Sequence, residues 1–273
     1  MALDPQQMRL PQNQQEALEL LRRMQQERTQ LQREQAHNLV MRRRKAILKG
    51  FKYDLTDENE YNVHANMVIG MGDNYMLREF SRFMVDEHNK NVLRFLLYYF
   101  NNCPLAESVF PDEDYKIHKN ILLVGEPGTG KTMLMQVFAD YLQATNNDNQ
   151  FTSISMTQLM NYQKVFGHID KYTYNELKGA SRQEAFDGVN PYNICLNDLG
   201  IATEQQKSFG TQLTQVTDEF LFARYEIYQQ YGKRYHITSN LTVKDFKKRF
   251  EARLVDRFKS FNVIELHGGS RRR

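Results

Sequence analysis

The sequence predicts an α/β fold in which a parallel five-stranded sheet is flanked by helices and preceded by a helical N-terminal region. Three observations support this prediction. From residue 116 onward, short apolar runs bounded by turns alternate with amphipathic stretches, as in successive βαβ units. One apolar run leads through a glycine-rich turn directly into an amphipathic segment. The N-terminal residues are instead rich in Gln, Arg and Glu and have helical spacing.

Each element can be placed from its pattern. Helical spacing over 76–101 puts Leu77, Phe80, Phe83, Met84, Val92, Phe95 and Leu96 on the inner side, whereas the acidic residues 53–75 are interpreted as an irregular linker. The expected strands are Asn120–Val124, Phe151–Ile154, Tyr192–Leu196, Tyr235–Thr238 and Val263–Leu266, and helices are expected at 131–143, 157–165, 211–230 and 242–258. Three regions result: a basic, Gln-rich helical arm (1–52), a linker and helical region (53–115), and the α/β domain (116–273).

Composition excludes several classes of protein. With 41% hydrophobic and 25% charged residues, the 273-residue chain can bury a core and stay soluble. No segment reaches the roughly 18 consecutive apolar residues of a membrane span, and the N-terminus lacks the apolar region of a signal peptide. The two cysteines, Cys103 and Cys195, are isolated, which excludes a disulfide framework and a cysteine zinc site. We therefore expect a cytoplasmic protein without a membrane partner.

The charge is unevenly distributed. The net charge is +3, but residues 1–52 contain 11 Lys/Arg and 5 Asp/Glu, so the remaining residues are slightly acidic. The run Arg42-Arg-Arg-Lys45 has no acidic residue near it, because none occurs between Glu34 and Asp54. Either this run is a solvated helix face, or it is a patch that contacts phosphates of a nucleic acid.

The strongest motif is a phosphate-binding loop. Gly125-Glu-Pro-Gly-Thr-Gly-Lys-Thr132 fits G-x-x-x-x-G-K-[ST] and lies between an expected strand and an expected helix, the context that this motif requires. Glycines let backbone N–H groups close around phosphates, Lys131 supplies a positive charge, and the Thr132 hydroxyl is a ligand for Mg²⁺. The candidate binding residues are Gly125, Glu126, Pro127, Gly128, Thr129, Gly130, Lys131, Thr132 and Met133.

A second strand ends in a polar pair. Asn193-Ile-Cys-Leu precedes Asn197 and Asp198, where two acids would be expected to hold the metal and orient a water molecule. Asn197 can hydrogen-bond to a metal-bound water but carries no charge, so Asp198 has the only carboxylate. Either Asp198 takes the metal role, or it polarises the water while Mg²⁺ is held more weakly.

Two further motifs follow toward the C-terminus. Tyr235-His-Ile-Thr-Ser-Asn240 is a strand that would direct the Asn240 amide at the terminal phosphate or the attacking water, although Thr-Ser-Asn is also ordinary turn chemistry. Arg253 and Arg257 are spaced for one helix face, and Arg257 is a candidate arginine finger for a neighbouring subunit. A surface pair bridged to Glu251 or Asp256 is the alternative for these arginines.

The order of these motifs resembles a known family. The segments GEPGTGKT, ICLNDLG, RYEIYQQYGKRYHITSNL, ARLVDRF and IELHGGSRR are similar to the AAA+ ATPases of the DnaC/IstB group, over residues 116–272. That group contains replicative-helicase loaders and ATPase subunits of transposition systems. The resemblance implies a P-loop NTPase (AAA+) sheet without a separate C-terminal lid, with ATP and Mg²⁺ as cofactors.

The resemblance also implies roles for individual residues. Gly125–Thr132 corresponds to Walker A, Asn197-Asp198 to Walker B, Asn240 to sensor one, Arg257 to the finger acting in trans, and Arg272 to a closing arginine that senses nucleotide. The family pattern has an acid where this chain has Asn197, which affects the expected hydrolysis rate more than binding. Residues 1–110 match nothing that we can identify, and in this family that part selects the partner.

The sequence thus favours an ATP-dependent switch. We expect it to form a homo-oligomer on DNA, preferably single-stranded, and to recruit or load a replicative helicase through its N-terminal region. One alternative is a transposition regulator that assembles on double-stranded DNA and recruits a transposase. Another is a nucleotide-binding adaptor with little hydrolysis, in which Asn197→Asp would raise turnover. A kinase is disfavoured, because Asn240 and Arg257 would then have no purpose.

Overall fold

The chain divides into two compact units, residues 1–52 and residues 53–273. The computed structural model describes Glu19, 22–26 and 28–30 of the first unit, and 53–173, 192–200, 210–250 and 252–271 of the second. The described residues of the first unit are helical and exposed, as expected for a helical arm. The elements below all belong to the second unit, which we call the α/β unit.

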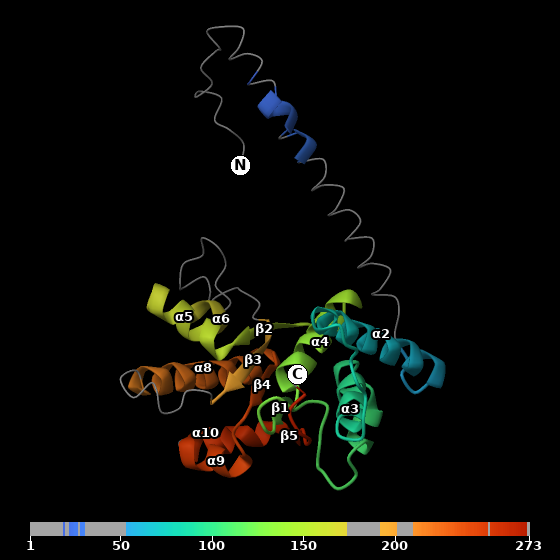
Figure 1. Ribbon diagram of the computed structural model, residues 1–273. Coiled ribbons are helices and arrows are strands. Elements are labelled where there is room, and N and C mark those ends of the chain that lie inside the picture. The colour runs from blue at the N-terminus through green and yellow to red at the C-terminus, as the bar shows by residue number, and fades with distance from the viewer. Residues whose placement is uncertain are drawn as a thin grey trace. The chain divides into compact units, whose positions relative to one another are not determined.

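A five-stranded sheet forms the centre of the α/β unit (Figure 1). Its strand order is β2–β3–β4–β1–β5, and all neighbouring strands are parallel. The strands are β1 (Asn120–Val124), β2 (Phe151–Ser155), β3 (Asn193–Leu199), β4 (Tyr235–Ser239) and β5 (Phe261–Glu265). Each overlaps an expected strand, so the predicted parallel five-stranded sheet is confirmed.

Helices cover both faces of the sheet, because strand side chains alternate between two cores. In β1, Ile121 and Leu123 face one core, and Leu122 and Val124 face the other. The first core includes α2 (Glu58–Met76), α3 (Lys90–Phe100) and α4 (Lys131–Ala144). The second includes α5 (Met156–Phe166), α6 (Asp170–Thr173), α8 (Gly210–Tyr231), α9 (Val243–Arg249) and α10 (Ala252–Arg257). Among the described residues, no helix combines the length and apolarity that crossing a membrane needs.

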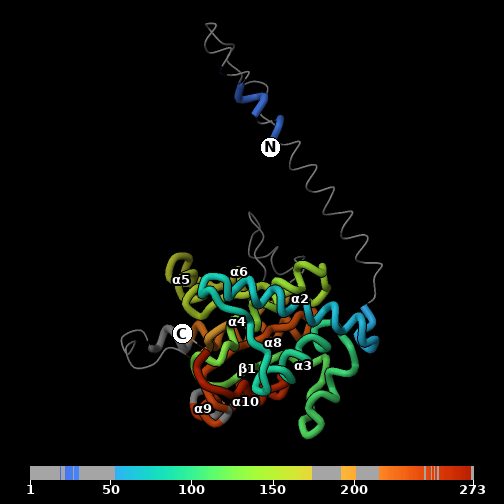
Figure 2. The backbone as a smooth tube through the Cα atoms, turned by 45° about the vertical axis from the view of Figure 1, so that its right-hand side comes forward, coloured from blue at the N-terminus to red at the C-terminus, as the bar shows by residue number. Residues whose placement is uncertain are grey.

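The interpretation of residues 53–75 as an irregular linker is wrong. They contain α2, whose N-terminus is capped by the Asp57 side chain, which accepts hydrogen bonds from the backbone N–H groups of Asn59 and Glu60 at 3.0 Å each. The helix packs on α4 (Figure 2), where the Tyr75 hydroxyl donates to Asp140 at 2.8 Å. Most exposed residues of α2 are polar, so hydrophobic spacing alone does not predict this helix.

The helical spacing found over 76–101 does not correspond to one continuous helix. A short 3-10 turn, η2 (Leu77–Glu79), follows α2, and α3 begins only at Lys90. Phe80 ends the turn in the left-handed conformation, with φ of 48°. Of the expected inner residues, Phe83, Val92, Phe95 and Leu96 are buried, whereas Leu77, Phe80 and Met84 are exposed.

The helix expected over 242–258 consists of two helices, α9 and α10. Phe250 interrupts them in an extended conformation, with φ of −102° and ψ of 148°. Its ring packs between Phe246 and Phe258, at centroid distances of 5.5 and 5.7 Å. The break lets three aromatic side chains enter the core together, which one straight helix would not allow.

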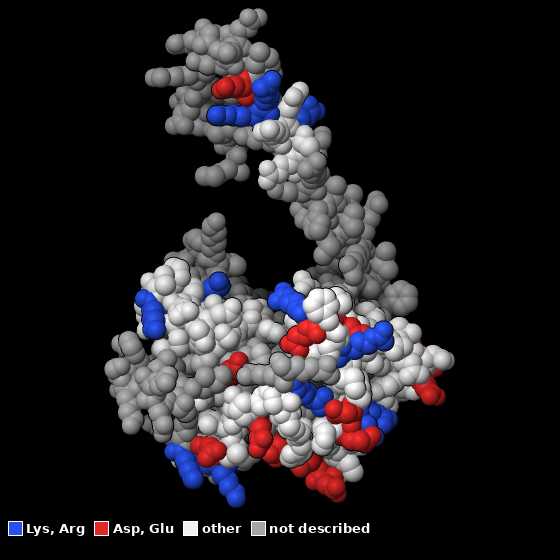
Figure 3. Space-filling view, in the orientation of Figure 1, with Lys and Arg blue, Asp and Glu red and all other residues white. Residues whose placement is uncertain are grey.

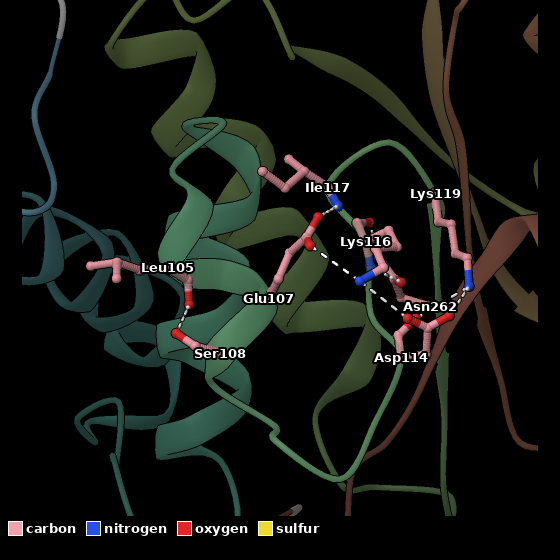
Figure 4. Close-up of polar contacts among 8 residues, drawn as sticks. All are labelled: Leu105, Glu107, Ser108, Asp114, Lys116, Ile117, Lys119 and Asn262. Atoms are coloured by element: carbon pink, nitrogen blue, oxygen red, sulfur yellow. Dashed lines mark hydrogen bonds and ion pairs between the residues drawn. The ribbon is translucent and has the colours of Figure 1, made fainter.

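The loop that leads into β1 is held on the neighbouring strand β5 (Figure 4). The Asn262 side chain accepts from the backbone N–H of Lys116 and donates to its carbonyl oxygen, both at 2.8 Å. Glu107, in the 3-10 turn η3 (Pro104–Ser108), accepts from the N–H of Ile117 at 3.1 Å and pairs with Lys116. These contacts fix where β1 begins, and therefore where the loop after it lies.

Candidate functional site

A cavity of about 650 Å³ lies at the carboxyl ends of β1, β3 and β4. In open parallel sheets this edge is the usual place for ligands, because loops and helix N-termini converge there. Residues 128–134 form one wall, and Asp198 and Asn240 contribute from the ends of β3 and β4. Residues of the segment 76–89 and of the C-terminal segment 266–271 complete the lining.

The glycine-rich loop after β1 requires glycine at two positions, because the C-terminal segment lies very close to the loop there. Gly125 and Gly128 have φ values of 145° and 87°, which side-chain-bearing residues rarely adopt. A Cβ atom on Gly128 would lie 2.4 Å from Ser270 Oγ, and one on Gly125 would lie 2.4 Å from the Leu266 carbonyl oxygen. The backbone N–H of Arg271 donates to the Gly128 carbonyl at 2.9 Å. The C-terminal segment therefore packs directly against the loop.

Lys131 starts helix α4 immediately after this loop and is 4% exposed. Its Nζ donates to the carbonyl oxygens of Gly125 and Glu126, at 2.8 and 2.7 Å. The ammonium group is thus enclosed by the loop at a helix N-terminus, where the backbone N–H groups also favour an anion. This combination suits the phosphate groups of a nucleotide.

Thr132 and Asp198 meet in the same cavity. The Thr132 hydroxyl donates to Asp198 Oδ1 at 3.0 Å, although the two residues are 66 positions apart in the sequence. Mg²⁺ in nucleotide sites is commonly held by one or two carboxylates, with phosphate and water oxygens as the other ligands. A hydroxyl and a carboxylate oxygen this close fit that ion, and the described residues contain no cluster of three His, Cys, Asp or Glu side chains that would suit another metal.

Asp198 owes its direction to an irregularity of the sheet. The pairing of β3 with β4 shifts between Leu196 and Leu199, and Asp198 has a left-handed φ of 63°. Its backbone N–H donates to the side-chain oxygen of Thr238 on β4, at 3.0 Å. Bulges of this kind redirect side chains next to functional sites.

Asn197 does not line the cavity. Its side chain is 2% exposed, and its Nδ2 donates to Ser153 Oγ at 2.7 Å and to the Ile154 carbonyl at 3.2 Å, both on β2. Its Oδ1 accepts from the Thr238 hydroxyl at 3.3 Å. The structure therefore brings Asp198, and not Asn197, to Thr132. The metal role expected for Asn197 stays a prediction.

The remaining predicted site residues lie in different places. Asn240 lines the cavity, whereas Glu126 and Pro127 are exposed and do not. Arg257 lies on the α8 side, with its guanidinium 4.3 Å from the Phe222 ring centroid and 4.5 Å from that of Tyr225. Arg272 lies outside the described residues.

Sequence analysis missed one wall of the cavity, which the segment 76–89 provides. Asp86 of this segment pairs with the Arg271 guanidinium at 2.8 Å, and it also accepts from the N–H groups of His88 and Asn89. The ion pair connects the segment with the C-terminal residues across the glycine-rich loop. The local sequence feature of the segment 76–89 is the Asp-x-x-Asn turn before α3. A turn of this kind does not indicate a ligand-binding site.

The fold and the site together define a P-loop nucleotide-binding protein. A family model described as AAA domain (dynein-related subfamily) matches residues 120–258, which is half of the chain. The chain belongs to this AAA domain family. The predicted AAA+ fold is thereby confirmed, and the matched residues include the glycine-rich loop.

Several solved structures are similar to the chain at low identity. The DnaC helicase loader is 14% identical, with 68% of this chain and 93% of that chain covered and a TM-score of 0.45. DnaI is 18% identical, with 70% and 87% covered and a TM-score of 0.42. Domain III of the replication initiation protein DnaA from Thermotoga maritima is 21% identical, with 68% and 65% covered and a TM-score of 0.43. No curated protein matches the chain.

Proposed function

We propose that the protein is an ATP-dependent switch of the DnaC/IstB group, which hydrolyses ATP to ADP and phosphate. The observation that carries the proposal is the convergence of Lys131, the Thr132–Asp198 pair and Asn240 on one cavity. These residues come from three separate elements, α4, β3 and the end of β4. A loop that only turned the chain would not need a buried cation, a carboxylate and an amide at the same place.

Each residue has a chemical role in this proposal. Lys131 and the N–H groups of the loop bind the β- and γ-phosphates, which carry most of the negative charge of ATP. Thr132 and Asp198 supply oxygen ligands where Mg²⁺ would bind, and Mg²⁺ would neutralise charge on the phosphates. The Asn240 amide orients the terminal phosphate or the water that attacks it. With a single carboxylate at this position, we expect slow turnover.

We further propose that copies of the chain assemble head to tail. Arg257 does not line the cavity of its own subunit, so it would contact ATP only from a neighbouring one. A head-to-tail contact is heterologous, which gives either a ring or an open helix. ATP bound in one subunit and contacted by Arg257 of the next would couple nucleotide occupancy to assembly.

The proposed nucleic-acid partner is single-stranded DNA, bound through its phosphates. Residues 1–52 have an excess of six basic residues, whereas the α/β unit is slightly acidic. Figure 3 shows basic and acidic side chains interspersed over the visible face of the α/β unit. Binding through the arm should weaken steeply with salt and depend little on base sequence. The proposed protein partner is a replicative helicase, recruited by the N-terminal region.

The test is steady-state ATP hydrolysis by the full-length protein, alone and with single- or double-stranded DNA. Lys131→Ala is the blank, because it removes the buried ammonium from the loop. Lys259→Ala is the matched control, since this lysine is exposed and pairs only locally with Asp256. We expect turnover that DNA stimulates, that Lys131→Ala abolishes and that Lys259→Ala preserves.

The other outcomes separate the remaining hypotheses. Stimulation by double-stranded DNA alone would favour the transposition regulator. Tight ATP binding with no turnover would favour the adaptor that uses ATP only as an assembly ligand. Equal ATP binding by the wild-type protein and Lys131→Ala would contradict the assignment of the phosphate-binding loop.

A further inference from the structure

The side chain of Asn197 connects three strands below the cavity. Its Nδ2 group donates to Ser153 Oγ and to the Ile154 carbonyl on β2, and its Oδ1 accepts from the Thr238 hydroxyl on β4. The Ile154 carbonyl can only accept, so the amide nitrogen must face β2 and the amide oxygen must face β4. Each polar atom of the amide therefore has a partner within the sheet.

The Thr238 hydroxyl connects the Asn197 amide to the backbone of Asp198 through hydrogen bonds. A hydroxyl has one hydrogen and two lone pairs. When Thr238 donates its hydrogen to Asn197, its lone pairs are directed at the backbone N–H of Asp198, which lies 3.0 Å away. The same oxygen is 3.5 Å from Thr132 Oγ1. Thr238 is fully buried, so water does not compete for these bonds.

The bond to Thr238 falls where the β3–β4 pairing is interrupted. At this bulge, the Asp198 N–H is satisfied by a side chain and not by the β4 backbone. The left-handed φ of Asp198 turns its carboxylate toward Thr132 Oγ1, at 3.0 Å. Such a conformation persists only where its surroundings hold it in place.

We propose that Asn197 and Thr238 are positioning residues, and that they form a hydrogen-bonded bridge which directs the Asp198 carboxylate at Thr132. This proposal replaces the metal role predicted for Asn197: its amide holds the bridge, and Asn197→Asp would break it. An ionised aspartate has no hydrogen to donate, so its oxygens would face the Ile154 carbonyl without a bond. The proposal rests on the proposed binding of ATP and Mg²⁺, but not on hydrolysis.

The test compares ATP affinity with and without Mg²⁺ in variants of the full-length protein. A fluorescent ATP analogue is titrated in Mg²⁺ and in EDTA, and the ratio of the two affinities is the Mg²⁺ gain. Thr238→Val keeps the shape of the side chain but removes the hydroxyl, whereas Thr238→Ser keeps the hydroxyl. Asp198→Asn is the reference for loss of the carboxylate. Thermal unfolding of each variant is measured in parallel.

We expect Thr238→Val and Asn197→Asp to lower the Mg²⁺ gain by about tenfold, as is common when a group that orients a metal ligand is lost. Affinity in EDTA should stay within about twofold, because Lys131 is untouched. Thr238→Ser should retain the wild-type gain. The matched control is Thr145→Val: Thr145 is a buried threonine whose hydroxyl bonds only to carbonyls of α4, so its loss should lower the melting temperature alone.

Two results would overturn the bridge. Asn197→Asp raising the Mg²⁺ gain would make position 197 a metal ligand, and an unchanged gain in Thr238→Val would remove the link to Asp198. If Asn197→Asp does not fold, Ser153→Ala removes one anchor of the Asn197 amide and should lower the gain about threefold. A wild-type protein that binds ATP without hydrolysing it would contradict the proposed ATPase activity. The Mg²⁺ gain of the variants would still test the bridge, because it measures binding alone.

Discussion

Backbone conformation at single residues determines how closely the C-terminal segment approaches the glycine-rich loop. Gly128 combines a left-handed φ with a Cβ position that would lie only 2.4 Å from Ser270 Oγ. Both constraints must be met for the Arg271 N–H to reach the Gly128 carbonyl. A side chain at this position would therefore disturb the loop and its cover together.

We predict that Gly128→Ala destabilises the protein and weakens ATP binding. Left-handed strain alone costs about 1 to 3 kcal/mol, and the overlap with Ser270 adds to it. The matched control is Gly70→Ala in α2, where nothing lies within 4 Å of an added Cβ and the helix should gain about 0.5 to 1 kcal/mol. Urea denaturation and ATP titration measure both variants. Equal stability of Gly128→Ala and wild type would contradict the geometry of the loop.

His236 on β4 is a buried histidine whose protonation opposes folding. Burial, together with the positive charges of Arg234 and Arg224, holds the pKa of His236 well below the usual 6.5. Its Nδ1 accepts the backbone N–H of Ile121 on β1 at 3.1 Å, which requires the unprotonated nitrogen. Below pH 6.5 the unfolded chain takes up a proton that the folded chain does not, so stability is present above that pH and falls as the pH decreases.

We predict that the free energy of unfolding declines between pH 6.5 and 5 by up to about 1.4 kcal/mol per pH unit for this histidine. His236→Gln removes the titrating group and should flatten the decline, even if the variant is less stable throughout. Thr145→Val, which removes no titrating group, is the control and should lower stability without changing the slope. Urea denaturation at several pH values gives the slopes. Parallel curves for wild type and His236→Gln would refute the assignment.

How much of the site the sequence reveals depends on whether its residues are contiguous. The glycine-rich loop is one unbroken motif, so its location at the cavity was predictable. The choice between Asn197 and Asp198 was not, because it depends on a bulge held by Thr238, some 40 residues later in the chain. The pairing of Asp86 with Arg271 spans an even longer separation and has no motif.

At the scale of elements, hydrophobic spacing predicted the buried strands. It did not predict helix α2 or the break between α9 and α10. Each strand carries apolar side chains at buried positions, most of all β1, and all five were found. Helix α2 presents a mostly polar surface and is defined by its Asp57 cap, so it was interpreted as a linker. The break between α9 and α10 depends on the packing of three phenylalanine rings, which spacing alone does not encode.

Helix α10 provides a test of assembly. We predict that Arg257→Ala preserves ATP binding but abolishes stimulated turnover, because the charge on the phosphates of the neighbouring subunit is then not neutralised. An equal mixture of Arg257→Ala and Lys131→Ala should recover about a quarter of wild-type turnover, since that fraction of heterologous contacts joins an intact loop to an intact arginine.

Arg253→Ala is the control for this mixing experiment, since Arg253 lies on the same helix but farther from the Phe222 ring, at 5.9 Å. Its mixture with Lys131→Ala should follow simple dilution. No recovery in the Arg257→Ala mixture would exclude a finger that acts in trans. Recovery that increases with protein concentration would link the effect to assembly.

At the scale of the whole molecule, the basic arm (residues 1–52) is one compact unit, and the candidate site belongs to the other. We predict that a fragment comprising residues 53–273 keeps the melting temperature and ATP affinity of the full chain. It should lose salt-dependent DNA binding, because the excess of basic residues lies in the arm. Fluorescence anisotropy with labelled DNA at several salt concentrations tests this. Undiminished DNA binding by the fragment would show that the arm is not the contact.

The strand order has a consequence for how the chain is made. In the described sheet β1 lies between β4 and β5 and is hydrogen-bonded to both, and these strands begin roughly 110 residues or more further along the chain. At about 5 to 20 residues per second, a ribosome takes roughly 6 to 20 s to synthesise that stretch. During this time Ile121–Val124 is an apolar strand without a partner, which is the kind of segment that chaperones protect from aggregation. The cavity at the carboxyl ends of β1, β3 and β4 is therefore completed late in the synthesis of the chain.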